Sequence, residues 1–380
     1  MSIASPPSGV WVWPELHPAQ RSVLLEVLVH GSRSRADLAR RTGLSRATLS
    51  RLTRDLVDFG FVSEGEAQPT SSRGRPSETL HLRADSAHFA GIKLTGDALY
   101  AVVTDLHANE IESVERPLES RDTAAVVAVI AEVVAGFRAR FPRLSAVGVC
   151  LAGDVEDSTG SAIVVGSHFL GWDEEPVQRL VEDATGLPAS VSNDVQALTA
   201  AHHWFGAAVG ARSFCVIGLG AGIGAGIFVN DELVRGSRGH SGKVGHVFVH
   251  DSGPLCDRGH AGCASAYVTI PAMLANSGAA DFDDLVSRVE AGDAVARRTI
   301  DDAGYALGVV VANLSNLVDP ERVIITGEGL AVARIAEDAL RSGIADRLDP
   351  AAEPVELEVR DFRFEDYAWA AAVSSIRHIV

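Results

Sequence analysis

The chain of 380 residues is long enough for two or three domains, and a composition of 47% hydrophobic and 22% charged residues excludes a wholly disordered protein. Four cysteines are too few for a disulfide framework, and no apolar run approaches the ~20 residues that a membrane helix needs. No basic stretch followed by an apolar core marks a signal peptide near the N-terminus. We therefore expect a cytoplasmic globular protein without a membrane partner.

The net charge of −17 is distributed unevenly along the chain. Residues 1–83 carry 11 arginines and 8 acidic residues, a net charge of +3, whereas the remainder carries −20. Seven of these arginines fall within residues 33–54, against the single acid Asp37. An acidic body repels a polyanion, so any contact with nucleic acid is predicted for the N-terminal part alone.

Two short helices are predicted first. An apolar stripe with helical spacing places the first between His17 and Gly31, and it consists of Val23, Leu24, Val27 and Leu28. Ser34 and Asp37, three residues apart, match a capping box and predict the start of the second helix. That helix is expected to stop near Gly43.

A third helix is predicted from Ser45, its N-cap, to about Phe59, with a buried face of Leu49, Leu52, Leu56 and Phe59. Two helices around a glycine turn are typical of the helix-turn-helix motif, whose second helix enters the major groove of DNA. Arginine can bond both acceptors of guanine, and hydroxyl groups suit base edges or phosphates. The side chains predicted to contact DNA from this helix are Arg46, Thr48, Ser50, Arg51 and Arg54.

Residues 61–82 are predicted to form a two-stranded wing with Arg73-Gly74-Arg75-Pro76 at its tip. Arg73 and Arg75 are predicted to enter a narrow minor groove, whose negative potential favours arginine. The alternative is a protein-binding module whose arginines form a solvated face. The apolar stripes, the helix N-caps, the arginine cluster and the wing all agree with one another, and this agreement favours a DNA-binding module.

The rest of the chain contains one pattern twice. Residues 89–105 and 213–234 each read as an apolar strand, a glycine turn and a second strand. Helices over 126–137 and 307–317, and strands over 147–151 and 323–326, follow them. The pattern predicts two α/β lobes with a cleft between them.

The predicted domains are a tail at 1–16, a winged helix-turn-helix domain at 17–83, and a body at 84–380. The lobes of this body comprise about 84–192 with the C-terminal helix, and 193–365.

Ligands of such folds bind at the carboxyl ends of strands. The glycine run over 218–226 lets backbone amides approach a phosphate, although a tight hairpin needs glycine equally. Asn193 and Asp194 follow a strand and precede a helix that starts near Val195. They can hydrogen-bond sugar hydroxyls, and Asp194 can act as a general base. An ordinary helix N-cap is the alternative for this pair.

Several motifs taken together resemble those of the ROK family, which contains repressors and sugar kinases. They are Ser-Arg-Gly-Arg-Pro at 72–76, Leu-Gly-Trp at 170–172, Ser-Asn-Asp at 192–194, Gly-Leu-Gly-Ala-Gly-Ile-Gly-Ala-Gly-Ile at 218–227, Gly-His-Ser-Gly-Lys-Val-Gly-His at 239–246 and Asn-Leu-Ser-Asn-Leu-Val-Asp-Pro at 313–320. The resemblance runs from about residue 17 to 380. It implies an actin-like, sugar-kinase or ribonuclease H-like α/β body behind the winged module. It also implies a sugar-responsive repressor, with sugar contacts at Asn193, Asp194 and His246.

The phosphate loops depart from the pattern of the family's kinases. Lys93 stands in place of the first acid, and Asp97 in place of a threonine of the first loop. Ala221 replaces the threonine of the second loop. Phosphoryl transfer depends on groups that hold metal and phosphate, so we expect neither ATP as a cofactor nor catalysis. The rival hypothesis is a sugar kinase with an attached DNA-binding module, in which Asp194 is the catalytic base.

The sugar pocket is altered in a similar way. Lys243 and Ser265 stand where the family has glutamates, and Lys93 and Lys243 are the only lysines of the chain. Three interpretations stay open: drift in a disused pocket, a lysine paired with Asp194 or another carboxylate, or a pocket for an anionic ligand such as a sugar acid or sugar phosphate. The residues predicted to bind ligand are Asn193, Asp194, Lys243 and His246.

The resemblance also implies a zinc motif, of which His246, Cys256 and Cys263 remain while Arg258 replaces one cysteine. Structural zinc takes four ligands. Asp257 or His260 is the candidate for the fourth, and a metal-free loop is the alternative.

The function expected from the sequence is that of a transcriptional repressor of carbohydrate-related genes. As a homodimer or homotetramer, it would bind palindromic operator DNA with half-sites ~34–36 Å, or a multiple of that, apart. A sugar or sugar-derived effector would shift the protein between two states. A scaffold that binds a protein partner through its body is a third hypothesis.

Overall fold

The computed structural model describes residues 11–65, 79–157 and 160–380. The chain forms two compact units, which are treated separately below. The first contains the chain up to Asp194 together with Tyr367–Val380, and the second contains Val195–Asp366. The chain therefore passes between the units twice, after Asp194 and before Tyr367. Within the described residues, no helix is both long and apolar enough to span a bilayer.

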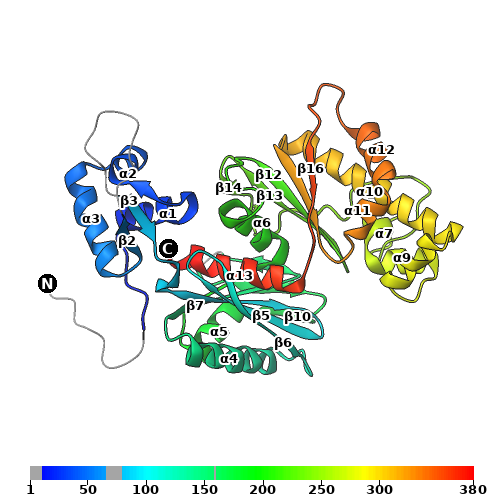
Figure 1. Ribbon diagram of the computed structural model, residues 1–380. Coiled ribbons are helices and arrows are strands. Elements are labelled where there is room, and N and C mark those ends of the chain that lie inside the picture. The colour runs from blue at the N-terminus through cyan, green and yellow to red at the C-terminus, as the bar shows by residue number, and fades with distance from the viewer. Residues whose placement is uncertain (1–10, 66–78, 158–159) are drawn as a thin grey trace. The chain divides into compact units, whose positions relative to one another are not determined.

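The N-terminal module has the predicted three helices and wing. Helices α1 (Pro18–His30), α2 (Arg35–Thr42) and α3 (Arg46–Asp58) accompany a sheet of β1 (Arg33–Ser34), β3 (Thr79–Leu82) and β2 (Val62–Gly65), in that order (Figure 1). Both predicted N-caps are confirmed, because the hydroxyl of Ser34 accepts the Asp37 amide at 3.1 Å and that of Ser45 accepts the Thr48 amide at 3.2 Å.

The predicted turn and buried faces of this module are present as well. Gly43 has φ 69°, the left-handed conformation that ends α2 and that glycine adopts readily. The apolar stripes of α1 and α3 are buried, except that Phe59 is only partly buried because it caps the end of α3. The wing tip with Arg73 and Arg75 lies outside the described residues, so their predicted DNA contacts stay predictions.

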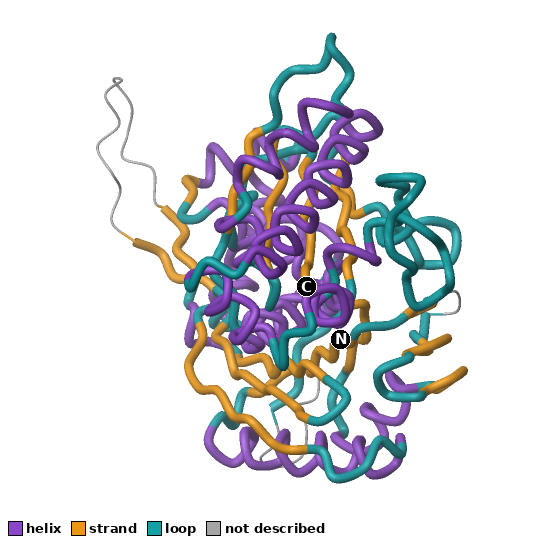
Figure 2. The backbone as a smooth tube through the Cα atoms, turned by 90° about the vertical axis from the view of Figure 1, so that its right-hand side faces the viewer, coloured by secondary structure: helices purple, strands orange, loops and turns teal. Residues whose placement is uncertain are grey.

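The first unit also holds a five-stranded sheet in the order β11 (Ala189–Asn193), β7 (Leu144–Leu151), β4 (His88–Leu94), β5 (Ala98–Asp105), β6 (Glu110–Pro117). Strands β11, β7 and β4 run parallel, and β4, β5 and β6 form an antiparallel meander. Helices α4 (Thr123–Arg140) and α5 (Val177–Thr185) lie on one face and α13 (Phe364–Ile379) on the other (Figures 1 and 2). A short turn, η1 (Ala84–Ser86), and a small sheet of β8 (Asp154–Glu156), β9 (Ile163–Ser167) and β10 (Trp172–Glu175) complete this unit.

The second unit repeats the theme with a sheet in the order β14 (Glu232–Leu233), β13 (Ile223–Val229), β12 (Phe214–Leu219), β15 (Arg322–Thr326), β16 (Glu356–Val359). Its helices are α6 (Asp194–Phe205), α7 (Ser265–Val268), α8 (Ile270–Ser277), α9 (Phe282–Glu290), α10 (Ala294–Val318), α11 (Ala331–Ile335) and α12 (Glu337–Arg347). Both predicted hairpins are present as antiparallel pairs, β4–β5 and β12–β13. The helix expected over 307–317 is only the second half of the 25-residue α10.

Two glycines let α13 lie directly on the first sheet. Gly91 of β4 and Gly148 of β7 are paired in register, and a Cβ atom on either would overlap backbone atoms of α13. The facing helix residues are small, and Ala368, Ala371 and Ala372 are fully buried. The close approach places the start of α13, at Tyr367, over the carboxyl-terminal half of the parallel strands.

We predict that Gly148→Ala lowers the free energy of unfolding by about 1–3 kcal/mol, because the new methyl group overlaps the Ala371 carbonyl. Gly166→Ala in the same unit is the matched control, since nothing lies within 4 Å of the position that its new methyl group would occupy. Its effect should stay within about 0.5 kcal/mol. Denaturant titration compares the two variants, and equal stability would contradict the close packing of α13.

Candidate functional site

The predicted DNA-reading face of α3 is open to solvent. Arg46, Ser50, Arg51 and Arg54 are exposed and Thr48 is partly exposed. The two hydroxyl groups already have partners, because that of Ser50 donates to the Arg46 carbonyl at 2.9 Å and that of Thr48 lies 2.9 Å from the Ser45 hydroxyl. The long-reaching donors of this face are therefore its three arginines.

These three guanidinium groups differ from those of the neighbouring helix. Arg35 pairs with Glu64, Arg40 with Asp37 and Arg41 with Glu26, so their charges are balanced within the module. Among the described residues, no ion pair engages the α3 arginines. Helix α3 is fixed against α1 by its apolar face and by Gln20, whose side chain donates to the Asp55 carboxylate at 2.9 Å. The module thus presents uncompensated positive charge on a firmly packed helix.

In the first unit, Lys93 and Asp194 form a buried ion pair at the carboxyl ends of β4 and β11. The exposed fractions of the two residues are 4% and 7%, and the Lys93 ammonium donates to Asp194 Oδ2. The same ammonium lies 4.5 Å from the ring centroid of Tyr367, at the start of α13. Of the three interpretations that the sequence left open, the structure bears out the pairing of a lysine with Asp194.

Neighbouring side chains complete this end of the sheet. Lys93, Cys150 and Ser192 stand in one row across β4, β7 and β11. The Cys150 thiol donates to the Tyr367 carbonyl at 3.2 Å, and burial raises its pKa to about 12. The amide of Asn193 donates to the Gly153 carbonyl at 3.0 Å. Lys93, Asp194, Cys150 and Asn193 are thus engaged, whereas the buried hydroxyl of Ser192 has no hydrogen-bond partner among the described residues.

The residues predicted to bind ligand are divided between the two units. Asn193 and Asp194 belong to the first unit, and Lys243 and His246 to the second. Lys243 is exposed in the long segment between β14 and α7. His246 turns its Nδ1 atom toward two cysteine thiols, which leaves Nε2 for any other contact.

Both candidate phosphate loops are hairpin turns. The Thr95 hydroxyl donates to the Asp97 carboxylate at 2.9 Å, so these two side chains are already hydrogen-bonded within the turn. In the second turn, the Gly220 amide donates to the Gly222 carbonyl at 2.9 Å, and the Glu328 carboxylate lies against Gly220. A carboxylate beside a phosphate site repels the ligand.

Glu328 was missed in the sequence analysis. The signal that could have found it is its position after β15, which is parallel to β12 and therefore ends at the same edge of the sheet.

The second unit holds a compact cluster of His246, Cys256, His260 and Cys263, whose potential ligand atoms all lie within 4.8 Å of one another. His246 Nδ1 lies 3.2 Å from His260 Nδ1, 3.5 Å from Cys263 Sγ and 3.9 Å from Cys256 Sγ. A tetrahedral zinc site with ordinary bond lengths has edges of about 3.3 Å between nitrogens and about 3.6 Å between nitrogen and sulfur. The four side chains therefore fit zinc.

The structure places His260, and not Asp257, as the fourth potential ligand. Asp257 is exposed and pairs with Arg258 at 3.7 Å. A tight turn brings His260 back to Cys256, because the Gly259 amide bonds the Cys256 carbonyl and the Cys256 amide bonds the His260 carbonyl, each at 2.9 Å. His260 thus joins the three predicted residues as a fourth potential ligand.

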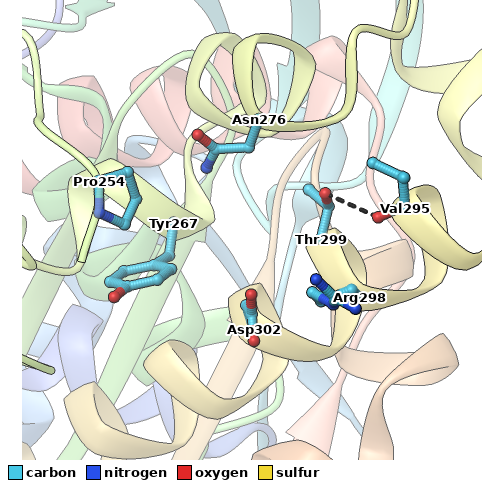
Figure 3. Close-up of a pocket in the computed structure, with 7 residues that line it drawn as sticks. All are labelled: Pro254, Tyr267, Asn276, Val295, Arg298, Thr299 and Asp302. Carbon is cyan, nitrogen blue, oxygen red and sulfur yellow. Dashed lines mark hydrogen bonds between the residues drawn. The ribbon is translucent and has the colours of Figure 1, made fainter. Parts of the chain in front are cut away.

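A cavity of about 260 Å³ adjoins this cluster through Tyr267, which packs against Cys256 and Cys263, and Figure 3 shows its lining side chains. They are Pro254, Tyr267, Asn276, Val295, Arg298, Thr299 and Asp302. Burial raises the pKa of Tyr267, and the Asp302 carboxylate raises it further. Pro254 and Tyr267 flank the cysteine-bearing loop in sequence, so the cavity wall depends on how that loop is held.

The family model described as "ROK family" matches residues 89–370. The chain belongs to the ROK family. A second model, the MarR family, matches residues 15–74, the part that folds as the winged module. Together with the structural likeness below, these matches confirm the predicted fold class, a winged helix-turn-helix followed by an actin-like sugar-kinase fold.

Three known proteins illustrate the range of this ROK chain's relatives. The xylose repressor of Bacillus spizizenii is 25% identical over 340 residues, which cover 87% of each chain. The glucokinase of Halalkalibacterium halodurans is 28% identical over 300 residues, which cover 72% of this chain and 89% of the glucokinase. The crystal structure of a ROK family transcriptional regulator, a homologue of Escherichia coli Mlc, superposes with a TM-score of 0.81 at 23% identity, covering 95% of this chain and 96% of that one.

We expect one zinc ion per chain at the four-residue cluster. Replacing His260 with alanine removes one direct ligand, so zinc affinity should fall by more than about 100-fold. Loss of a residue that only hydrogen-bonds a metal ligand already costs up to about that factor. Asp257→Asn is the matched control and should retain the metal. Native mass spectrometry and competition with a chromophoric chelator measure both, and equal affinities would contradict the assignment of His260.

Proposed function

We propose that this chain is a transcriptional repressor that binds operator DNA through α3 and its wing and senses a sugar through its ROK body. The observation that carries the proposal is the exposed arginine face of α3, uncompensated within the described module and joined to an acidic body. Similarity to a xylose repressor over 87% of both chains supports it, since that match extends over module and body together.

The charge distribution supports binding through the module alone. An acidic body is repelled by the phosphate backbone, whereas each phosphate-bonding arginine releases counterions and raises affinity at low salt. We propose a homodimer or homotetramer that reads palindromic half-sites about 34–36 Å, or a multiple of that, apart.

A sugar kinase is the second candidate, and the glucokinase relative is the reason to weigh it. Two features of the site argue against it. A general base has to reach the hydroxyl that it deprotonates, but Asp194 is buried and accepts from Lys93. The Glu328 carboxylate lies against the glycine turn that would hold phosphate. We therefore propose a sensor without phosphoryl-transfer activity.

The proposed effector is a neutral sugar. Asn193 and His246 are the proposed contacts, and Asp194 can join them only when it leaves its ion pair with Lys93; Lys243, exposed in the second unit, is the fourth proposed residue. Because Lys93 already neutralises Asp194, the anionic-ligand interpretation retains only Lys243 as its cation. The zinc site is proposed to be structural, since four protein ligands leave no position for a reacting water.

Arg51→Ala tests the DNA proposal. If Arg51 contacts a base, the variant should lose about 1–3 kcal/mol of operator affinity and relax specificity at one position; if it contacts phosphate, the salt slope should fall by about 1. The operator is first selected from genomic fragments with the full-length protein, and affinity is then measured by fluorescence anisotropy.

Arg341→Ala is the matched control for this measurement. It removes an exposed arginine from the second unit, where Arg341 pairs with Glu337 at 2.7 Å, and should leave operator affinity unchanged. If no fragment is selected, or if the two variants bind alike, the α3 assignment is wrong.

A coupled assay with ATP, magnesium and a panel of hexoses and pentoses tests the kinase candidate. We expect no turnover above a no-enzyme blank. Phosphorylation of any sugar that disappears in Asp194→Asn would establish the rival function and make Asp194 its base.

A further inference from the structure

Lys93 touches both places at which the chain passes between the two units. Asp194 is the last residue of the first unit before the chain leaves it, and Tyr367 is the first residue after the chain returns. The Lys93 ammonium donates to the Asp194 carboxylate and lies 4.5 Å from the centroid of the Tyr367 ring. One side chain therefore links two crossings that are 173 residues apart in the sequence.

A second contact ties the returning crossing to the same row of the sheet. Cys150 is the β7 neighbour of Lys93, and its thiol donates to the Tyr367 carbonyl at 3.2 Å. Cys150 is fully buried. The side chain of Tyr367 is thus held by Lys93 and its backbone by Cys150, while Asp194 is held by Lys93.

Burial makes these contacts interdependent. A lysine side chain is long enough to reach solvent from many positions, yet only 4% of Lys93 is exposed. A buried ammonium is stable only while its carboxylate partner and the adjoining ring stay in place. Movement of Asp194 out of this position leaves an unpaired buried charge, so Lys93 must then move and release the Tyr367 ring as well.

We propose that Lys93 is a clamp that couples the two crossings, so that the chain segments around Asp194 and Tyr367 open together or not at all. The hinge between the two units of a sensor is the part that has to change when a ligand shifts its conformation. Lys93 thus contributes to the free-energy cost of opening these two segments. The clamp itself does not depend on the proposed DNA binding.

Thiol labelling of the full-length protein tests the clamp, because two buried cysteines report on different events. Cys150 lies beneath the returning crossing, and Cys215 lies in β12 of the second unit. Both are fully buried, and burial raises the pKa of each to about 12, so neither thiol reacts readily until its surroundings open. Selective labelling of Cys150 reports local opening, and labelling of both reports global unfolding.

In Lys93→Met, N-ethylmaleimide should label Cys150 at least about tenfold faster than in the wild type, while the Cys215 rate stays unchanged. Loss of one partner of a buried ion pair costs more free energy than a tenfold change in an equilibrium constant represents. Peptide mass spectrometry reads both sites. Arg288→Met is the matched control, since it removes the Arg288–Asp293 pair of 2.7 Å from the second unit and should not change the Cys150 rate.

The double variant Lys93→Met/Asp194→Asn removes both buried charges and keeps the volumes similar, so it remains informative if the single variant fails to fold. The same selective labelling of Cys150 is expected. Hydrogen exchange separates a clamp from a local packing role: amides near 194 and near 367 should accelerate together, while those of β7 stay protected.

A wild-type Cys150 rate in the folded variants overturns the proposal. A parallel rise in the labelling rates of Cys150 and Cys215 also overturns it. So does faster hydrogen exchange at only one of the two crossings. None of these measurements uses DNA or ligand, so failure of the clamp would leave the repressor proposal standing, and failure of operator selection would leave the clamp intact.

Discussion

A buried ammonium group requires a carboxylate, and this requirement joins three distant parts of the chain. Lys93 comes from the first hairpin, Asp194 from the start of α6 and Tyr367 from the start of α13. The glycines at 91 and 148 make the third contact achievable, because they let α13 settle on the sheet closely enough to bring Tyr367 over Lys93. Removing the ammonium would therefore affect the hinge, the candidate ligand site and the packing of α13 at once.

The same pair is the chemical argument for the proposed sensor without phosphoryl-transfer activity. A carboxylate is useful as a base only when it is accessible and oriented toward a hydroxyl. Here Asp194 is instead a structural acceptor, and the second unit adds the Glu328 carboxylate where a phosphate would need positive charge. Both features are compatible with the family's fold, so the proposed sensor needs no change of architecture.

The local features were predictable from sequence because they depend on residues close together in the chain. The caps at Ser34 and Ser45, the left-handed Gly43 and the two hairpins are of this kind. The first half of α10 was missed, since its surface is rich in charged residues such as Arg297, Arg298, Asp301 and Asp302 and hides the apolar stripe.

The site was only partly predictable, because its decisive contacts are tertiary. Sequence marked Lys93 as unusual and Asp194 as a candidate sugar contact but left three interpretations open, since the two residues are about a hundred positions apart. The choice of His260 over Asp257 depends on a turn that folds the ring back toward His246. Glu328 became visible only through the parallel register of β15 and β12.

The scarcity of lysine has a practical consequence for anyone who studies this protein. Of its two side-chain amines, one is buried in an ion pair and the other, on Lys243, is exposed. Amine-directed fluorophores, crosslinkers and surface-coupling reagents will therefore modify one defined side chain of the folded chain. The molecule carries its own single side-chain attachment point, close in sequence to His246 and remote in sequence from the arginines that would read DNA.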